Sequence, residues 1–74
     1  MKISSETIYA IETQIETYKS RIDTYNVTIE RLQKMPTTPA VIKSIEGYKT
    51  QVQFLNSKIE ILKQDLEYLK TLTE

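Results

Sequence analysis

The chain has 74 residues, contains no cysteine or histidine, and balances ten Lys and Arg against ten Asp and Glu. Without cysteine or histidine it cannot build a disulfide framework, a Cys/His zinc site, or a thiolate or imidazole catalytic centre. A chain this short forms at most one small domain, which needs very regular helix packing or a partner to bury enough apolar surface.

The charges are balanced within each half of the chain as well, with five basic and five acidic residues in 1–35 and again in 36–74. A nucleic-acid-binding protein is expected to carry a basic stripe, so this balance argues against nucleic acid as a partner. No apolar run approaches the ~18 residues that a membrane span needs, and no apolar leader follows Lys2. We therefore expect a soluble chain, and the absence of cysteine is compatible with a cytoplasmic location.

The first half carries large apolar side chains in alternating steps of three and four residues, which place them on one face of a helix. Ser4 or Ser5 can cap this helix, and Glu6 then lies in the first turn, where the helix dipole favours a carboxylate. We predict a first helix over about 4–35. Its apolar ladder is Ile8, Ile11, Ile15, Tyr18, Ile22, Tyr25, Ile29 and Leu32.

A turn over 36–39 separates this helix from a second one, predicted over about 39–72. Pro36 disfavours helical geometry at the residue before it. Thr38 is a good N-cap, and Pro39 then occupies the first helical position, where proline is best tolerated. The second ladder keeps the same alternation: Val41, Ile45, Tyr48, Val52, Leu55, Ile59, Leu62, Leu66 and Leu69.

Because so short a turn between long helices makes them antiparallel neighbours, the predicted fold is all-α: a single domain over 1–74 forming an antiparallel two-helix coiled-coil hairpin. Pairing positions a and d across the hairpin sets Tyr25 opposite Val52 and Tyr48 opposite Ile29, so no layer opposes two tyrosines. The predicted hairpin core is Ile15, Tyr18, Ile22, Tyr25, Ile29, Tyr48, Val52, Leu55, Ile59 and Leu62.

The polar residues offer no strong catalytic candidate. The same register brings Glu12 near Lys63, a surface pair worth at most ~1 kcal/mol, and sets Arg21 facing Lys58. Carboxylate pairs such as Glu12 and Glu16 lie on solvated helix faces without a concavity, so we expect no enzyme and no cofactor or metal site. The core tyrosines could stack on a ligand ring, but a narrow seam favours buried rings with hydroxyls at the rim.

A second apolar stripe, which we call the c-stripe, consists of Gly47, Phe54, Ile61 and Tyr68, spaced seven residues apart at heptad position c of the second helix. Position c lies well round the helix from the a/d seam, so the hairpin cannot bury these residues itself. A column of three large apolar side chains indicates a partner interface, although single exposed apolar residues need no explanation. Gly47 would let another backbone approach closely.

A hairpin covers each seam residue from one side only, so we expect it to be marginal alone and to associate with itself, most simply as a two-fold dimer forming a four-helix bundle. The expected function is an adaptor, small chaperone or assembly factor that also binds another protein. The alternative is a small phage-type inhibitor or sequestering protein that binds a host protein or small ligand as an oligomer. Nucleic-acid binding is a third and weaker possibility.

The turn Pro36-Thr37-Thr38-Pro39-Ala40 resembles the Pro-x-x-Pro-Ala corner of type III secretion needle subunits, which are also small helical hairpins. The resemblance covers these five residues. The regular heptads on both sides and the polar end Lys70-Thr71-Leu72-Thr73-Glu74 depart from that family, so we do not assign the chain to it.

Overall fold

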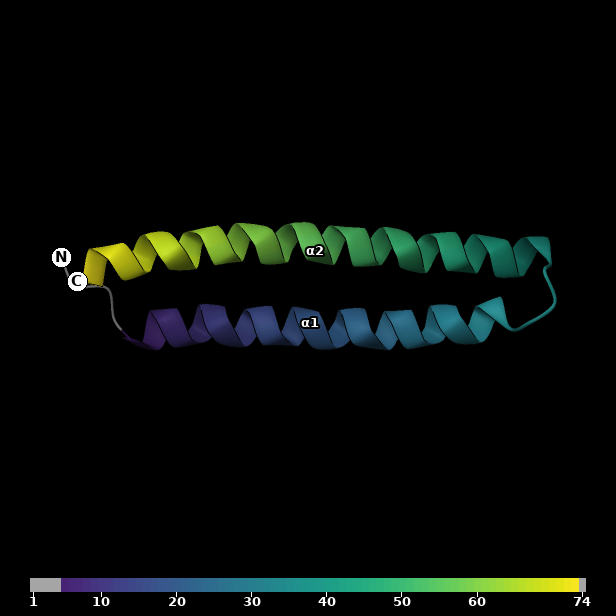
Figure 1. Ribbon diagram of the computed structural model, residues 1–74, viewed down its shortest axis with the longest axis horizontal. Helices are drawn as coiled ribbons and strands as arrows, with labels where there is room; N and C mark the ends of the chain where they lie inside the picture. The colour runs from purple at the N-terminus through teal and green to yellow at the C-terminus, as the bar shows by residue number, and fades with distance from the viewer. Residues whose placement is uncertain (1–4, 74) are drawn as a thin grey trace.

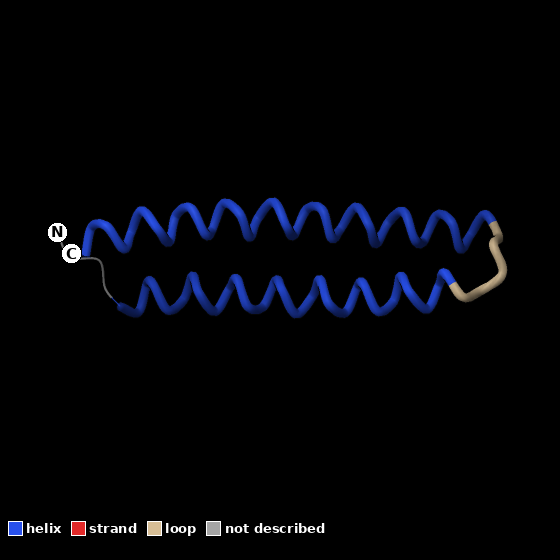
Figure 2. The backbone as a smooth tube through the Cα atoms, in the orientation of Figure 1, coloured by secondary structure: helices blue, strands red, loops and turns tan. Residues whose placement is uncertain are grey.

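The computed structural model describes residues 5–73 and places them in two helices joined by a short turn. Helix α1 spans Ser5–Gln33 and helix α2 spans Pro39–Thr73. The helices run antiparallel, side by side, along a body of 57 × 14 × 12 Å (Figures 1 and 2). No strand occurs within 5–73, so the predicted all-α helical hairpin is confirmed. The expected cap at Ser4 lies outside the described residues.

Helix α1 ends at Gln33, two residues before the expected boundary. The Lys34 N–H donates to the Arg31 carbonyl at 3.2 Å, and the Met35 N–H donates to the Leu32 carbonyl at 3.1 Å. Both bonds span three residues rather than four, so the chain tightens as it leaves the helix. Pro36 follows directly and disfavours helical geometry at Met35.

Helix α2 begins with the cap that the sequence predicts. The Thr38 hydroxyl oxygen accepts a hydrogen bond from the Val41 N–H at 3.2 Å, and the Thr38 carbonyl accepts one from the Ile42 N–H at 3.0 Å. These bonds satisfy N–H groups that the first turn of a helix otherwise leaves unpaired. Pro39, which has no N–H, occupies the first helical position.

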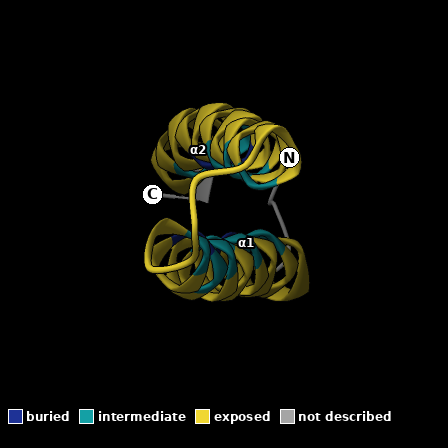
Figure 3. Cartoon of the chain, turned by 90° about the vertical axis from the view of Figure 1, so that its right-hand side faces the viewer, coloured by how far each residue is buried: buried dark blue, intermediate teal, exposed yellow. Residues whose placement is uncertain are grey.

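The core is the seam between the two helices, and the less exposed residues lie on the sides of the two ribbons that face each other (Figure 3). Four side chains are buried, with 5–7% of their surface exposed: Ile15, Ile29, Leu55 and Ile59. All other described members of the two ladders are half-buried. Two further side chains, Thr28 and Lys58, are half-buried although neither belongs to a ladder. Each directly precedes a core isoleucine, at heptad position g, which flanks the seam.

One aromatic contact adds to the expected packing. The rings of Tyr25 and Tyr48 contact each other across the hairpin, with centroids 5.5 Å apart and planes tilted by 41°. The pairing by layers gave each of these rings an aliphatic partner and did not anticipate a contact between the two rings. A tyrosine side chain is long enough to reach a ring in the adjacent layer as well as the residue opposite it in its own layer.

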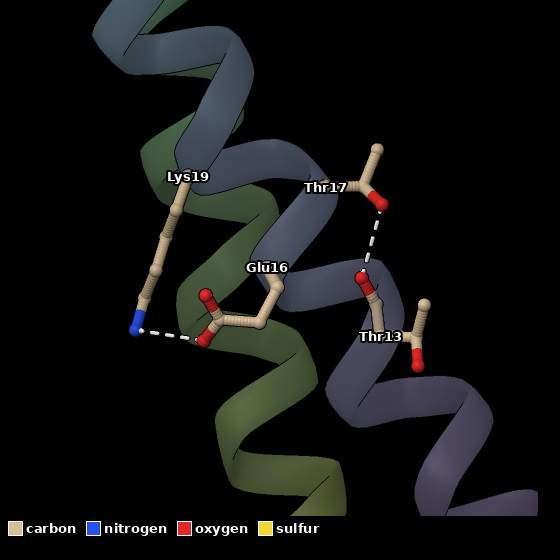
Figure 4. Close-up of polar contacts among 4 residues, drawn as sticks. All are labelled: Thr13, Glu16, Thr17 and Lys19. Atoms are coloured by element: carbon tan, nitrogen blue, oxygen red, sulfur yellow. Dashed lines mark hydrogen bonds and ion pairs between the residues drawn. The ribbon is translucent and has the colours of Figure 1, made fainter.

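The outer faces of the helices are polar and make local contacts. The Thr17 hydroxyl donates to the Thr13 carbonyl at 3.0 Å, and Lys19 forms an ion pair with Glu16 at 3.6 Å (Figure 4). Hydroxyls elsewhere in the helices bond back to carbonyls in the same way, among them those of Thr24, Thr28, Thr50 and Ser57. Such bonds satisfy a hydroxyl within its own helix.

Candidate protein-interaction surface

The large members of the c-stripe are exposed on α2. Phe54, Ile61 and Tyr68 have 56%, 58% and 57% of their surface accessible. Because they recur every seven residues, they form one column along the helix, well away from the seam that α1 covers. A column of half-exposed aromatic and aliphatic side chains is characteristic of a contact surface.

Gly47 leaves a hollow in the c-stripe near the turn. A Cβ atom added at Gly47 would have nothing within 4 Å, so no other part of the described chain approaches this backbone. The hollow is lined by Ser44, Gly47, Tyr48 and Gln51. The close approach that the sequence suggested at Gly47 is therefore absent within the hairpin described, and the space is open to a partner.

Ala40 extends the c-stripe to the start of α2, because it is exposed and lies seven residues before Gly47. Alanine is too small to stand out in the sequence as an exposed apolar residue, so the heptad pattern of large side chains does not include it. Its inclusion shows that the stripe is graded in size. Small residues, Ala40 and Gly47, lie near the turn, whereas Ile61 and Tyr68 lie near the other end of α2.

Lys58 connects the c-stripe to the seam. Its Nζ lies 4.6 Å from the Phe54 ring centroid and 5.6 Å from the Tyr18 ring centroid. The Arg21 guanidinium carbon lies 5.9 Å from the centroid of the same Tyr18 ring, so both cations lie close to one aromatic side chain. Each cation is attracted to the ring. These contacts also explain why Lys58 is half-buried, since its aliphatic stem follows the edge of the seam.

Two shallow hollows join the c-stripe to the groove between the helices. In one, Ile61 and Leu62 from α2 meet Tyr18 from α1. In the other, Tyr68 and Leu69 from α2 meet Ile11 from α1. A partner that covers the c-stripe would therefore also cover the partly exposed edge of the hairpin core. The candidate surface is wider than the single column that the heptad pattern predicts.

The stripe is specific to α2. The same heptad position in α1 holds Ala10, Thr17, Thr24 and Arg31, which do not form an apolar column. The remaining exposed large apolar side chains of the described residues are spread over positions b, e, f and g of the two helices: Tyr9, Val27, Met35, Ile42 and Leu72. Scattered residues of this kind are normal on a protein surface.

Within residues 5–73, no three Asp or Glu residues are arranged to hold a metal ion, and neither helix is long and apolar enough to cross a membrane. Glu12 and Lys63, both in the described part of the chain, line one hollow without forming an ion pair. Glu16 pairs with Lys19 on an exposed face, where the pair contributes at most about 1 kcal/mol. No protein-family model, curated protein or solved structure gives a significant match to this chain.

Proposed function

We propose that the protein is a non-enzymatic interaction module, a coiled-coil hairpin that associates with itself and acts as an adaptor, small chaperone or assembly factor. The observation that supports this proposal is the column of Phe54, Ile61 and Tyr68, each more than half exposed on a helix whose other outward positions are mostly polar. Exposed apolar columns of this kind are typical of surfaces that another protein covers.

The thin core of the hairpin supports self-association. Only four side chains of the described residues are less than a tenth exposed, because each helix covers the other from one side. A single core of this size in a short chain provides little net stability. Covering the exposed half of each large stripe residue would contribute about 1 kcal/mol per side chain, in each copy, to the free energy of association. A two-fold dimer forming a four-helix bundle is the simplest assembly that does so.

The proposal is tested by the mass of the protein in solution. Sedimentation equilibrium of the wild type should give about twice the chain mass of 8.7 kDa. The variant Phe54→Glu/Ile61→Lys places two charges on the c-stripe and should sediment as the single chain, with its helical circular dichroism partly retained at high concentration.

The matched control is Val27→Glu/Tyr9→Lys, which introduces the same charges at exposed apolar positions of α1 that lie outside the c-stripe. This variant should keep the dimer mass. An unchanged mass for the c-stripe variant would reject this surface as the contact, and a monomeric wild type would reject self-association altogether.

A further inference from the structure

We infer that the c-stripe is occupied by the same stripe of a second copy, running antiparallel about a two-fold axis at Phe54. This inference rests on the self-association proposed above and specifies its geometry. Stripe residues recur every seven positions on both sides of Phe54, with small residues towards the turn and large ones away from it. An antiparallel copy centred on Phe54 therefore sets Gly47 against the partner's Ile61, and Ala40 against the partner's Tyr68.

The residues that line the hollow at Gly47 have the spacing of a site that accepts a single side chain from a facing helix. In knobs-into-holes packing, one side chain enters a hole formed by four residues of the opposite helix. The residues that line this hollow, Ser44, Gly47, Tyr48 and Gln51, have the spacing i, i+3, i+4 and i+7 of such a hole. With no Cβ at its centre and nothing within 4 Å of that position, the hole has room for the partner's isoleucine.

A parallel arrangement of the two stripes fits poorly. It would set Tyr68 against the partner's Tyr68 and Gly47 against the partner's Gly47, so the helices would be forced apart at one end and leave a void at the other. The distance between packed helices depends on the side chains at the contact, and is ~8 Å for small residues and ~10 Å for large ones. Opposing small with large residues keeps this distance even along the whole stripe.

The polar residues that border the stripe are compatible with the antiparallel arrangement. Antiparallel helices bring equivalent flanking positions together, as in antiparallel coiled coils. Around an axis at Phe54, Lys58 lies level with the partner's Gln51, and Asp65 with the partner's Ser44, to within about one residue. Neither pair opposes like charges, and each can form a hydrogen bond at the rim.

The experiment is a double-mutant cycle on the dimer dissociation constant, measured by sedimentation equilibrium of the full chain. Gly47→Leu fills the hole and should raise the dissociation constant about tenfold, because overpacking costs affinity. Ile61→Ala removes the knob and should also raise it about tenfold. In the double variant, the leucine at 47 meets the partner's alanine at 61, so the larger residue faces the smaller one. The dissociation constant of this variant should return to within about threefold of the wild type.

The control is Gln53→Leu, which adds an apolar side chain at an exposed position of α2 outside the c-stripe and should leave the dissociation constant unchanged. Gly47→Leu should itself fold, since the position is open in the hairpin and leucine favours a helix more than glycine does. Circular dichroism of each variant checks this.

The outcomes separate the two proposals. A wild type that is monomeric at every concentration overturns the proposed function and this inference together. A dimeric wild type overturns the inference alone if Gly47→Leu tightens the dimer, which a parallel arrangement predicts, or if the double variant shows no recovery. The antiparallel arrangement is supported if each single variant weakens the dimer and the double variant restores its dissociation constant.

Discussion

Tyr25 of α1 and Tyr48 of α2 contact each other across the hairpin, with ring centroids 5.5 Å apart and planes tilted by 41°. Tilted aromatic pairs at this separation contribute ~0.5–1.5 kcal/mol beyond the area they bury. Substituting each tyrosine with leucine, alone and together, should therefore give a coupling free energy of about 1 kcal/mol in urea unfolding at one fixed protein concentration. The same cycle on Tyr18 and Tyr48, which share no contact in the described structure, should be additive.

Burial at the seam predicts that replacing one isoleucine of α2 lowers the free energy of unfolding much more than replacing another. Ile59 is 5% exposed, whereas Ile42 is 44% exposed. Ile59→Ala should lower the free energy of unfolding by about 3 kcal/mol, because it loses buried area and leaves a cavity. Ile42→Ala should lower it by less than about 1 kcal/mol. Equal losses in urea unfolding would mean that the seam is not the core.

The cap of α2 gives a second matched pair of variants. Thr38 accepts the hydrogen bond from the Val41 N–H, so Thr38→Ala should reduce the free energy of unfolding by about 1 kcal/mol. Thr37→Ala removes the same hydroxyl one residue earlier, where the residue is exposed, and should change stability by less than about 0.5 kcal/mol. Thermal unfolding should rank the two variants in this order. The reverse order would place the start of α2 elsewhere.

Much of the fold could be predicted because apolar periodicity and turn chemistry act locally. The alternating ladders of the two helices coincide with the side chains that the hairpin covers, and Pro36, Thr38 and Pro39 place the turn through backbone geometry alone. What the pattern could not provide is side-chain reach. The contact between Tyr25 and Tyr48 crosses from one layer to the next, and a heptad assignment records only layers.

The large residues of the candidate surface could be predicted from the sequence, whereas its hollow at Gly47 and its border at Lys58 could not. Phe54, Ile61 and Tyr68 are visible as a column in the sequence, whereas a hole is visible only once the side chains around Gly47 are placed. Lys58 was expected to face Arg21, but its position beside the Phe54 ring depends on how a long flexible side chain folds over its neighbours. Position g, which Lys58 shares with Thr28, could not have identified the two as half-buried, because other residues at this position, such as Gln14 and Gln51, are exposed.

The central claim, that a second copy completes the hairpin, is tested most directly by thermal unfolding at protein concentrations from about 1 µM to about 1 mM, because association makes the midpoint depend on concentration. The midpoint of the wild type should rise steadily over this range. That of Phe54→Glu/Ile61→Lys should stay constant. A wild-type midpoint that is high and independent of concentration would show a self-sufficient monomer and contradict the account.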